Sequence, residues 1–152
     1  MTDEEFAAYL ALRHELRGVE FKSSGSRDEK PFLAKVVRAM LGIANCRGGG
    51  FVILGVADTG SRLEPVGMTR GDLVTWEKYD HVADAVSAYA DPNLDFGLEI
   101  RNHEGKRYVV LHVREFENVP VLCKKDYQGV LREGACYVRT RRKPETRTHF
   151  KT

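Results

Sequence analysis

Three carboxylates and one lysine in the first 58 residues are of types that could take part in metal-assisted hydrolysis if the fold brings them together. Glu15 and Glu20 are five residues apart, and Lys22 lies one strand period after Glu20. Asp58 follows the apolar run Phe51–Val56. Carboxylate oxygens are the ligands that Mg²⁺ and Mn²⁺ prefer, and such an ion can activate water and neutralise a phosphate. Lys22 would then stabilise the negative charge that develops during the reaction.

Each of these residues also has an ordinary structural explanation. Glu20 and Lys22, one residue apart on a strand, could form an ion pair or belong to a solvated face. Glu15, at the end of a helix, is typical of protein surfaces, and an aspartate before Thr-Gly, as at Asp58, is typical of turns. The catalytic hypothesis therefore depends on the three carboxylates acting together.

A strand, a helix and a second strand must position these residues. Val19–Lys22 alternates apolar and polar side chains, which predicts a short strand. An amphipathic helix is predicted from Pro31 to Asn45, and the branched apolar residues of Phe51–Val56 predict a buried strand. A right-handed crossover makes the two strands parallel and places their carboxyl ends on one side. We therefore expect Glu20 and Asp58 to converge.

The rest of the chain predicts further helices and strands. Thr2–Glu5 has the pattern of a capping box, which predicts a first helix from Asp3 to about His14. Residues 61–74 are expected to be irregular. A third helix over residues 76–89 and strands over 94–100, 108–113, 120–123 and 135–139 follow from periodicity. The expected fold class is α+β, with a mixed sheet, a βαβ-like N-terminal unit, a third helix and C-terminal antiparallel strands.

The glycines at 48–50 do not have the arrangement of a nucleotide loop. They follow a helix and precede a strand, so they face the helix carboxyl end, whose partial charge is negative and repels phosphate. No Gly-Lys-Ser/Thr sequence follows them. We expect a tight turn with left-handed backbone and no nucleotide cofactor.

Composition narrows the class of protein. The chain of 152 residues is long enough for one domain with a core, and its three cysteines lack metal-binding spacing, as expected for reduced thiols. No apolar run reaches the length of a membrane span, so we expect a soluble, cytoplasmic protein. Residues 1–30 hold five basic and seven acidic side chains, whereas residues 121–152 hold nine and three. This C-terminal charge would attract polyanions.

Several of these segments together resemble one known family. HELRGVEFK at residues 14–22, Ala44-Asn45 with the glycine pair after it, and GVADTG at residues 55–60 are similar to motifs of the Schlafen AlbA-like domain. The resemblance continues less tightly to about Thr146. It implies that residues 1–140 form this domain and that residues 141–152 are a basic tail or the start of a linker.

The resemblance implies a nucleic-acid-binding fold and an activity. Schlafen-type nucleases cut structured RNA, such as tRNA, with three acidic residues, which match Glu15, Glu20 and Asp58 here. The implied function is a metal-dependent endoribonuclease that uses Mg²⁺ or Mn²⁺ at these carboxylates, with RNA favoured over DNA. The alternative is a non-catalytic DNA- or RNA-binding module of a transcriptional regulator or defence protein. Because those nucleases pair two such lobes, a homodimer is expected, and a further domain could follow the C-terminus.

Basic and aromatic residues of the second half are the candidates for contacting nucleic acid. Tyr137 and Tyr127 could stack on bases, although Tyr137 and Arg139 could instead share one strand face. The candidates for phosphate contacts are Arg47, Lys124, Lys125, Arg132, Arg139, Arg141, Arg142, Lys143 and Arg147.

Overall fold

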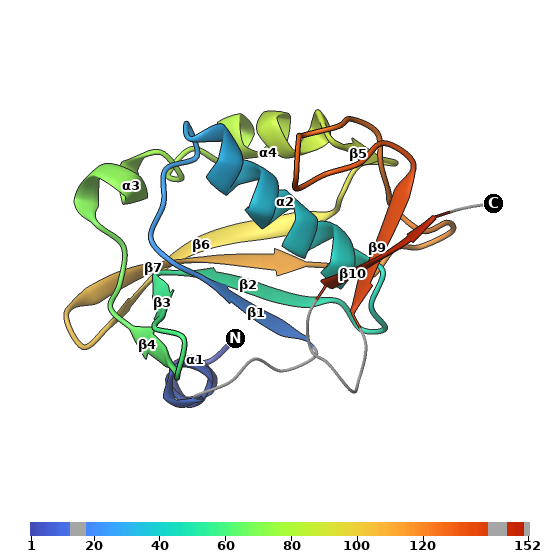
Figure 1. Ribbon diagram of the computed structural model, residues 1–152. Helices are drawn as coiled ribbons and strands as arrows, with labels where there is room; N and C mark the ends of the chain where they lie inside the picture. The colour runs from blue at the N-terminus through green and yellow to red at the C-terminus, as the bar shows by residue number, and fades with distance from the viewer. Residues whose placement is uncertain (13–17, 140–145, 151–152) are drawn as a thin grey trace.

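A four-stranded mixed sheet forms the centre of the fold (Figure 1). The computed structural model describes residues 1–12, 18–139 and 146–150, the last five as backbone. The order across the sheet is β1-β2-β7-β6. β1 and β2 are parallel, and the other neighbours are antiparallel. The strands are β1 (Val19–Lys22), β2 (Gly50–Leu54), β6 (Phe96–His103) and β7 (Lys106–Val113).

The helix α2 (Lys30–Ala44) connects the two parallel strands and covers one face of the sheet. Pro31 lies in its first turn and Asn45 caps its end, as predicted. Ten of its residues are buried, and nine of them pack with Val52, Leu54 and β7 residues in the larger of two apolar cores. This βαβ-like unit and the antiparallel strands confirm the α+β class.

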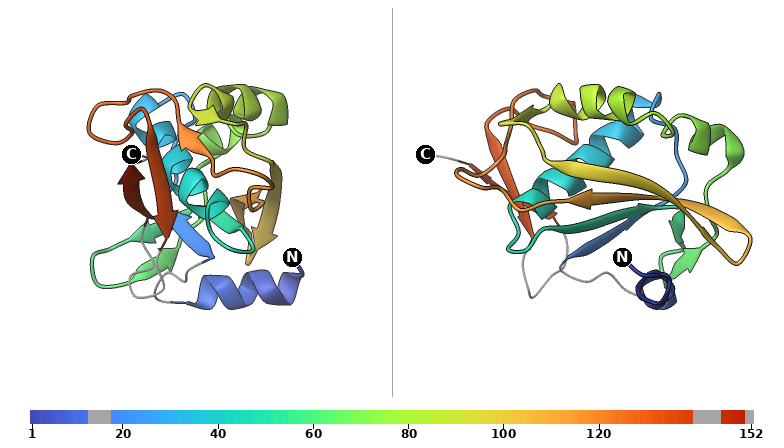
Figure 2. Two further views of the ribbon diagram at one scale, coloured as in Figure 1. Left: turned by 90° about the vertical axis from the view of Figure 1, so that its right-hand side faces the viewer. Right: turned by 180° about the vertical axis from the view of Figure 1, so that it is seen from behind.

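A shorter helix and a hairpin cover the opposite face (Figure 2). The helix α1 (Asp3–Ala11) begins with the predicted capping box between Thr2 and Glu5. Its buried residues Phe6 and Leu10 pack with residues of β1 and of the hairpin in a second core. The hairpin consists of β3 (Val56–Asp58) and β4 (Leu63–Pro65).

Two short helices and two ribbons complete the fold around α2. The ribbons pair β5 with β8 and β9 with β10, both antiparallel. None of the helices in the described ranges is long and apolar enough to cross a membrane. The elements are α3 (Arg70–Val74), α4 (Tyr79–Ser87), β5 (Ala90–Asp91), β8 (Leu122–Cys123), β9 (Ala135–Arg139) and β10 (Thr146–Phe150).

The predicted third helix is shorter than expected, because α4 begins only at Tyr79. Trp76 has the helical spacing but lies ahead of the helix, where its Nε1 donates to the carbonyl of Gly25 at 2.9 Å. The segment 61–74, expected to be irregular, contains β4 and α3. The hydroxyl of Thr69 caps α3 by accepting from the backbone of Asp72.

One strand prediction also changes. The expected strand Phe51–Val56 stops at Leu54, since Gly55 has a φ of 115° and turns the chain into β3. A β-carbon at Gly55 would lie 2.9 Å from the Tyr108 ring, so glycine suits this bend. The predicted tail also contributes to the fold, because Thr146–Phe150 forms β10 and pairs with β9, which would otherwise present an open edge.

Candidate functional site

Glu20 and Arg139 form a buried ion pair between β1 and β9. Each is 4% exposed, and they are the two buried charged residues among those described. The guanidinium of Arg139 donates to Oε1 of Glu20 and, at 3.4 Å, to the carbonyl of Val19. Glu20 pairs in register with Val52, whose side chain belongs to the α2 core, so its carboxylate lies on the α2 face of the sheet.

Lys22 supplies a second positive charge to the same carboxylate. Its Nζ lies 3.1 Å from Oε2 of Glu20, and its side chain is more exposed than that of Arg139. The structure thus brings two of the predicted catalytic residues together, in the ion pair that the sequence offered as an alternative. Two cations already lie against this carboxylate. A metal ion that approached Glu20 would therefore be repelled by their positive charge.

Asp58 lies apart from this ion pair on the β3–β4 hairpin. It is exposed, and its Oδ1 accepts a hydrogen bond from the backbone of Gly60 at 2.8 Å. This is the turn arrangement that an aspartate before Thr-Gly favours. β3 nevertheless contacts β1, so the hairpin adjoins the strand that carries Glu20. Glu15, the remaining predicted carboxylate, lies outside the described residues.

The described donors do not fit a Mg²⁺ or Mn²⁺ site. Within the ranges that the structure describes, which exclude Glu15, no group of three or more His, Cys, Asp or Glu side chains is placed to hold a metal ion. Glu20 is neutralised by cations, and Asp58 is engaged in its own turn. No catalytic step through a metal follows from this arrangement.

Tyr137 and Arg139, which were predicted to contact nucleic acid, lie inside the protein. Tyr137 is 2% exposed, and the guanidinium of Arg38 lies 5.1 Å from the centre of its ring. Its hydroxyl accepts from the backbone of Arg132 at 3.0 Å. Both residues point from β9 toward α2, because alternate residues of a strand share a face. In this conformation neither side chain is available to a base or a phosphate.

Other predicted contacts lie on the surface. The side chains of Arg47, Lys124, Lys125 and Arg132 are exposed, and Tyr127 is half-buried. Arg147 lies on β10, where only the backbone is described. Arg141, Arg142 and Lys143 fall outside the described residues.

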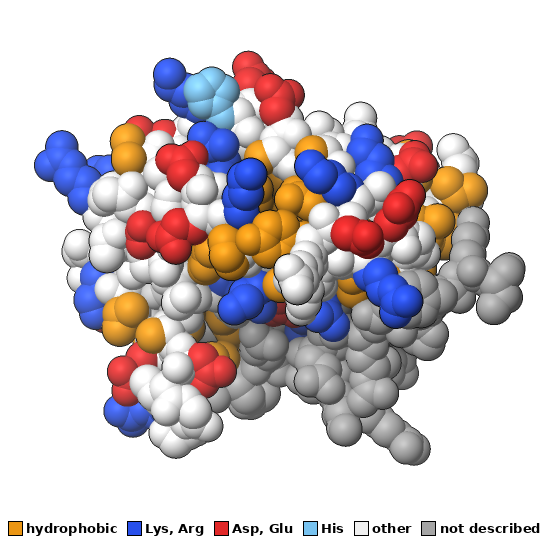
Figure 3. Space-filling model, turned by 45° about the horizontal axis from the view of Figure 1, so that its top comes forward, with side chains coloured by type: hydrophobic (Ala, Val, Ile, Leu, Met, Phe, Trp, Pro, Cys, Tyr) orange, Lys and Arg blue, Asp and Glu red, His pale blue; other side chains and the backbone are white. Residues whose placement is uncertain are grey.

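The structure adds two basic residues of α2 that sequence reasoning missed. Lys35 is exposed and Arg38 half-buried, three residues apart on the outer side of an otherwise apolar helix. Their three-residue spacing, which places both on one side of a helix, was the feature of the sequence that could have identified them. Arg38 and Arg132 line a common hollow of about 570 Å³ beside the loop 124–134. On the face shown in Figure 3, Lys and Arg side chains border an apolar area, with Asp and Glu side chains among them.

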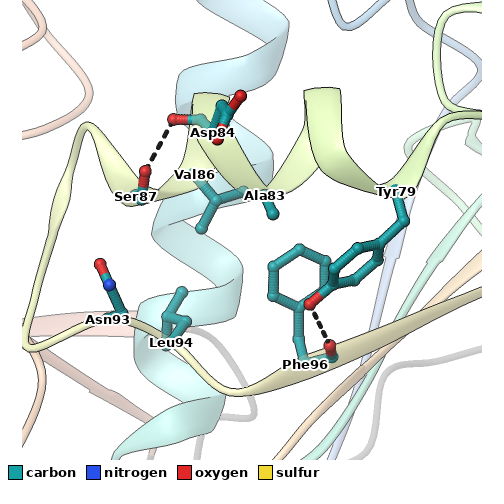
Figure 4. Close-up of a pocket in the computed structure, with 8 residues that line it drawn as sticks. All are labelled: Tyr79, Ala83, Asp84, Val86, Ser87, Asn93, Leu94 and Phe96. Carbon is teal, nitrogen blue, oxygen red and sulfur yellow. Dashed lines mark hydrogen bonds between the residues drawn. The ribbon is translucent and has the colours of Figure 1, made fainter.

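A smaller hollow of about 290 Å³ lies between α4 and the start of β6 (Figure 4). The Tyr79 hydroxyl donates to the carbonyl of Phe96 at 3.0 Å, and the rings of these residues lie against each other. The Ser87 hydroxyl donates to the carbonyl of Asp84 at 2.9 Å. The hydroxyls of Tyr79 and Ser87 therefore serve local structure, and none of the predicted site residues lines this hollow.

Asn45 links three segments at the end of α2. Its amide nitrogen donates to the carbonyls of Val121 and Tyr137, each at 2.9 Å, and its Oδ1 accepts from the nitrogen of Val121 at 2.8 Å. The Ala-Asn motif therefore has a structural role, because it fixes β9 and the segment before β8 to the helix.

Comparison with known proteins gives one family and a shared fold. The sequence matches the family described as "Schlafen, AlbA_2" over residues 15–146. The fold is similar to that of the DIP2311 protein from Corynebacterium diphtheriae, with a TM-score of 0.61, 18% identity and 96% of this chain covered. This chain spans 25% of that protein's chain.

A second solved structure is similar over nearly its whole length. It is the N-terminal domain of an ATP-dependent DNA helicase RecG-related protein from Nitrosomonas europaea, with a TM-score of 0.56 and 23% identity. The similarity covers 86% of this chain and 84% of that domain. Comparison with curated proteins gives no match.

Proposed function

The chain belongs to the Schlafen AlbA_2 family, and on that basis we propose that it is a nucleic-acid-binding domain. The contact surface in this proposal combines the outer side of α2 with the loop 124–134. We name it the α2 cationic surface, and its residues are Lys35, Arg38, Lys124, Lys125 and Arg132.

The observation that supports this surface is the placement of Arg38 and Arg132 around one hollow. They come from elements far apart in the sequence, and Lys124 and Lys125 are exposed on the same loop as Arg132. The loop also carries Asp126, whose Oδ1 accepts from the backbone of Glu133 at 2.6 Å. Cations spread over two elements suit the regularly spaced phosphates of a nucleic-acid backbone, which bind without regard to sequence.

Binding can be tested by fluorescence anisotropy with a labelled hairpin RNA, a single-stranded RNA and a duplex DNA at several salt concentrations. Charge reversal at an exposed position, as in Lys125→Glu or Arg132→Glu, is expected to weaken binding. Each lost phosphate contact should also lower the slope of log K against log[salt] by about 1. Lys78→Glu, at an exposed position on α4's N-terminal cap, is the matched control. Unchanged affinity in both surface variants would refute the proposal that the α2 cationic surface contacts nucleic acid.

Within this proposal RNA is favoured as the ligand, because the family resemblance includes enzymes that act on structured RNA such as tRNA. The anisotropy comparison decides between the two polymers directly. Tighter binding of the hairpin RNA than of the duplex DNA is expected, and the reverse order would assign the domain to DNA.

A metal-dependent endoribonuclease is the second candidate. The observation in its favour is that β3, which ends at Asp58, contacts β1, which carries Glu20. Against it stand the two cations on the Glu20 carboxylate. Catalysis would require the carboxylates of Glu15 and Asp58 to lie beside that of Glu20. It would also require Lys22 or Arg139 to move away from Glu20 so that a metal ion could bind there.

Cleavage can be tested by incubating total tRNA and duplex DNA with the protein in Mg²⁺ or Mn²⁺, and with EDTA. Asp58→Asn is the informative variant, because Asp58 is exposed and its replacement spares the buried ion pair. Glu15→Gln completes the test, and Glu64→Gln on the adjacent strand β4 is the control. Metal-dependent cutting that both site variants abolish would establish the nuclease. Binding without cutting would leave a binding module.

We also propose a homodimer, since the resembled nucleases pair two such lobes. Light scattering at working concentration tests this, and a monomer would contradict it.

A further inference from the structure

A second hollow is lined by residues of α3 and of the β6–β7 turn. These elements lie at the end of the sheet opposite to β9 (Figure 1). The hollow has a volume of about 540 Å³ and lies between α3 and the turn that joins β6 to β7. We name it the α3 hollow. Its lining residues are Val66, Met68, Arg70, Leu73, Glu77, Gly105, Lys106 and Arg107.

The α3 hollow has an unusually apolar border for a surface feature. Val66 is 50% exposed, and Val74 on α3 is 56% exposed, which makes them two of the four large hydrophobic residues exposed in the described ranges. Val74 is four residues after Arg70, so both side chains lie on the same side of α3. Half-buried Met68 and buried Leu73 lie in the lining itself. Exposed apolar groups gathered in this way are typical of interaction sites.

Among the charged side chains that line the hollow, the positive ones predominate. Arg70, Lys106 and Arg107 are exposed, and Glu77 is the one carboxylate in the lining. The Nζ of Lys106 lies 3.4 Å from the carbonyl oxygen of Pro65, which is a long and therefore weak hydrogen bond. Three cations facing one carboxylate leave a net positive charge, so the complementary ligand is acidic.

Backbone hydrogen bonds hold the walls of the hollow in place. The backbone nitrogen of Met68 donates to the carbonyl of Arg107 at 2.7 Å, and the backbone nitrogen of Gly67 donates to the carbonyl of Gly55 at 2.8 Å. The nitrogen of Thr69 donates to the hydroxyl of Ser24 at 3.0 Å. The segment before α3 is therefore tied to β7 and to the loop before α2. A preformed site loses less conformational entropy when it binds its ligand.

We propose that the α3 hollow binds an acidic segment of a partner protein that inserts an aliphatic side chain between Val66 and Leu73. Basic residues around an apolar floor match a peptide with carboxylates on both sides of a hydrophobic residue. Nucleic acid fits less well, because the apolar side chains of Val66, Met68 and Leu73 have no counterpart in a phosphate backbone. The site is also separate from the α2 cationic surface, and this inference does not depend on the proposed function.

The test uses the full chain and a labelled peptide in which leucines are flanked by glutamates. Anisotropy should show saturable binding, and a peptide with lysines in place of the glutamates should not bind. Arg107→Glu and Val66→Asp are each expected to weaken peptide binding about tenfold, a loss of ~1.4 kcal/mol. Lys78→Glu is the control for charge outside the hollow, and Arg107→Lys should retain binding. All of these positions are exposed, so unfolding should not obscure the result.

Three results would overturn the proposal. The first is the absence of saturable binding of the acidic peptide. The second is equal affinity in Arg107→Glu, Val66→Asp and the wild-type protein. The third is that Arg107→Glu and Arg70→Glu weaken the binding of hairpin RNA or duplex DNA as much as that of the peptide, because the hollow would then be a nucleic-acid contact.

Discussion

The guanidinium of Arg139 holds the carboxylate of Glu20 across 119 residues of sequence, and both side chains are buried. The pair joins β9, which packs on α2, to β1, which is at the edge of the sheet. Lys22 approaches the same carboxylate from a more exposed position. The most chemically suggestive carboxylate of the sequence thus serves, in this conformation, to connect two parts of the fold.

Removing one partner of this pair should destabilise the protein strongly. Arg139→Gln leaves the buried Glu20 carboxylate without the guanidinium that pairs with it, and losses of about 3–5 kcal/mol are typical when such a pair is broken. Urea unfolding followed by circular dichroism measures the change. Arg62→Gln breaks a surface pair with Glu64 and should cost less than about 1 kcal/mol. Equal losses in the two variants would contradict the role of the buried pair.

Asn45→Ala should also destabilise the fold. It removes the amide that bonds both backbone groups of Val121 and the carbonyl of Tyr137, which leaves buried polar groups without these partners. A loss of about 1–3 kcal/mol in the free energy of unfolding is expected. Asn102→Ala, at an exposed position of β6, is the control. A loss no greater than that of the control would show that water replaces the Asn45 bonds.

Gly48 and Gly49 offer a paired test of the turn after α2. Both have positive φ, 84° and 65°, so alanine is strained at either position by about 1 kcal/mol or more. At Gly48 a β-carbon would meet nothing within 4 Å, whereas at Gly49 it would lie 2.3 Å from the carbonyl oxygen of Val113. Gly49→Ala should therefore lower the melting temperature well beyond Gly48→Ala. Similar melting temperatures would contradict the close approach to β7.

Stability should decrease as the pH falls below about 6.5. Partial burial, with the nearby charge of Arg114, lowers the pKa of His112, whose ring stacks on Phe51 at 4.7 Å between centroids. Between the lowered pKa of His112 in the folded protein and its higher pKa in the unfolded chain, the unfolded chain binds a proton more readily. The contribution of His112 to stability is therefore complete above the unfolded pKa and is lost as the pH falls toward the folded pKa. His112→Gln should have a smaller loss of stability between pH 7.5 and pH 5.5, as measured by urea unfolding.

The control for this pH effect is His81→Gln, at an exposed position of α4. Its stability should follow that of the wild-type protein across the same pH range. An unchanged pH dependence in His112→Gln would assign the effect to other groups.

Local patterns predicted much of the fold because their causes are local. The apolar stripe of α2, the capping box at Thr2 and the alternation in β1 and β6 follow from helix and strand periods, and each element is present. The glycines after α2 adopt the left-handed backbone that a tight turn requires. The same local motifs carried the resemblance to the family that the chain matches.

The sequence by itself determined most of the helices and strands, though not β4 and α3, and it determined which faces are apolar and which family the chain belongs to. Only the tertiary structure decided that Arg139 meets Glu20, that Tyr137 is buried under Arg38 and that residues after 145 complete a ribbon. The physical reason is that helix and strand periods act between near neighbours in the chain. The partner of a charge or an aromatic ring depends instead on which strands and helices pack together, and this was not encoded in any local spacing.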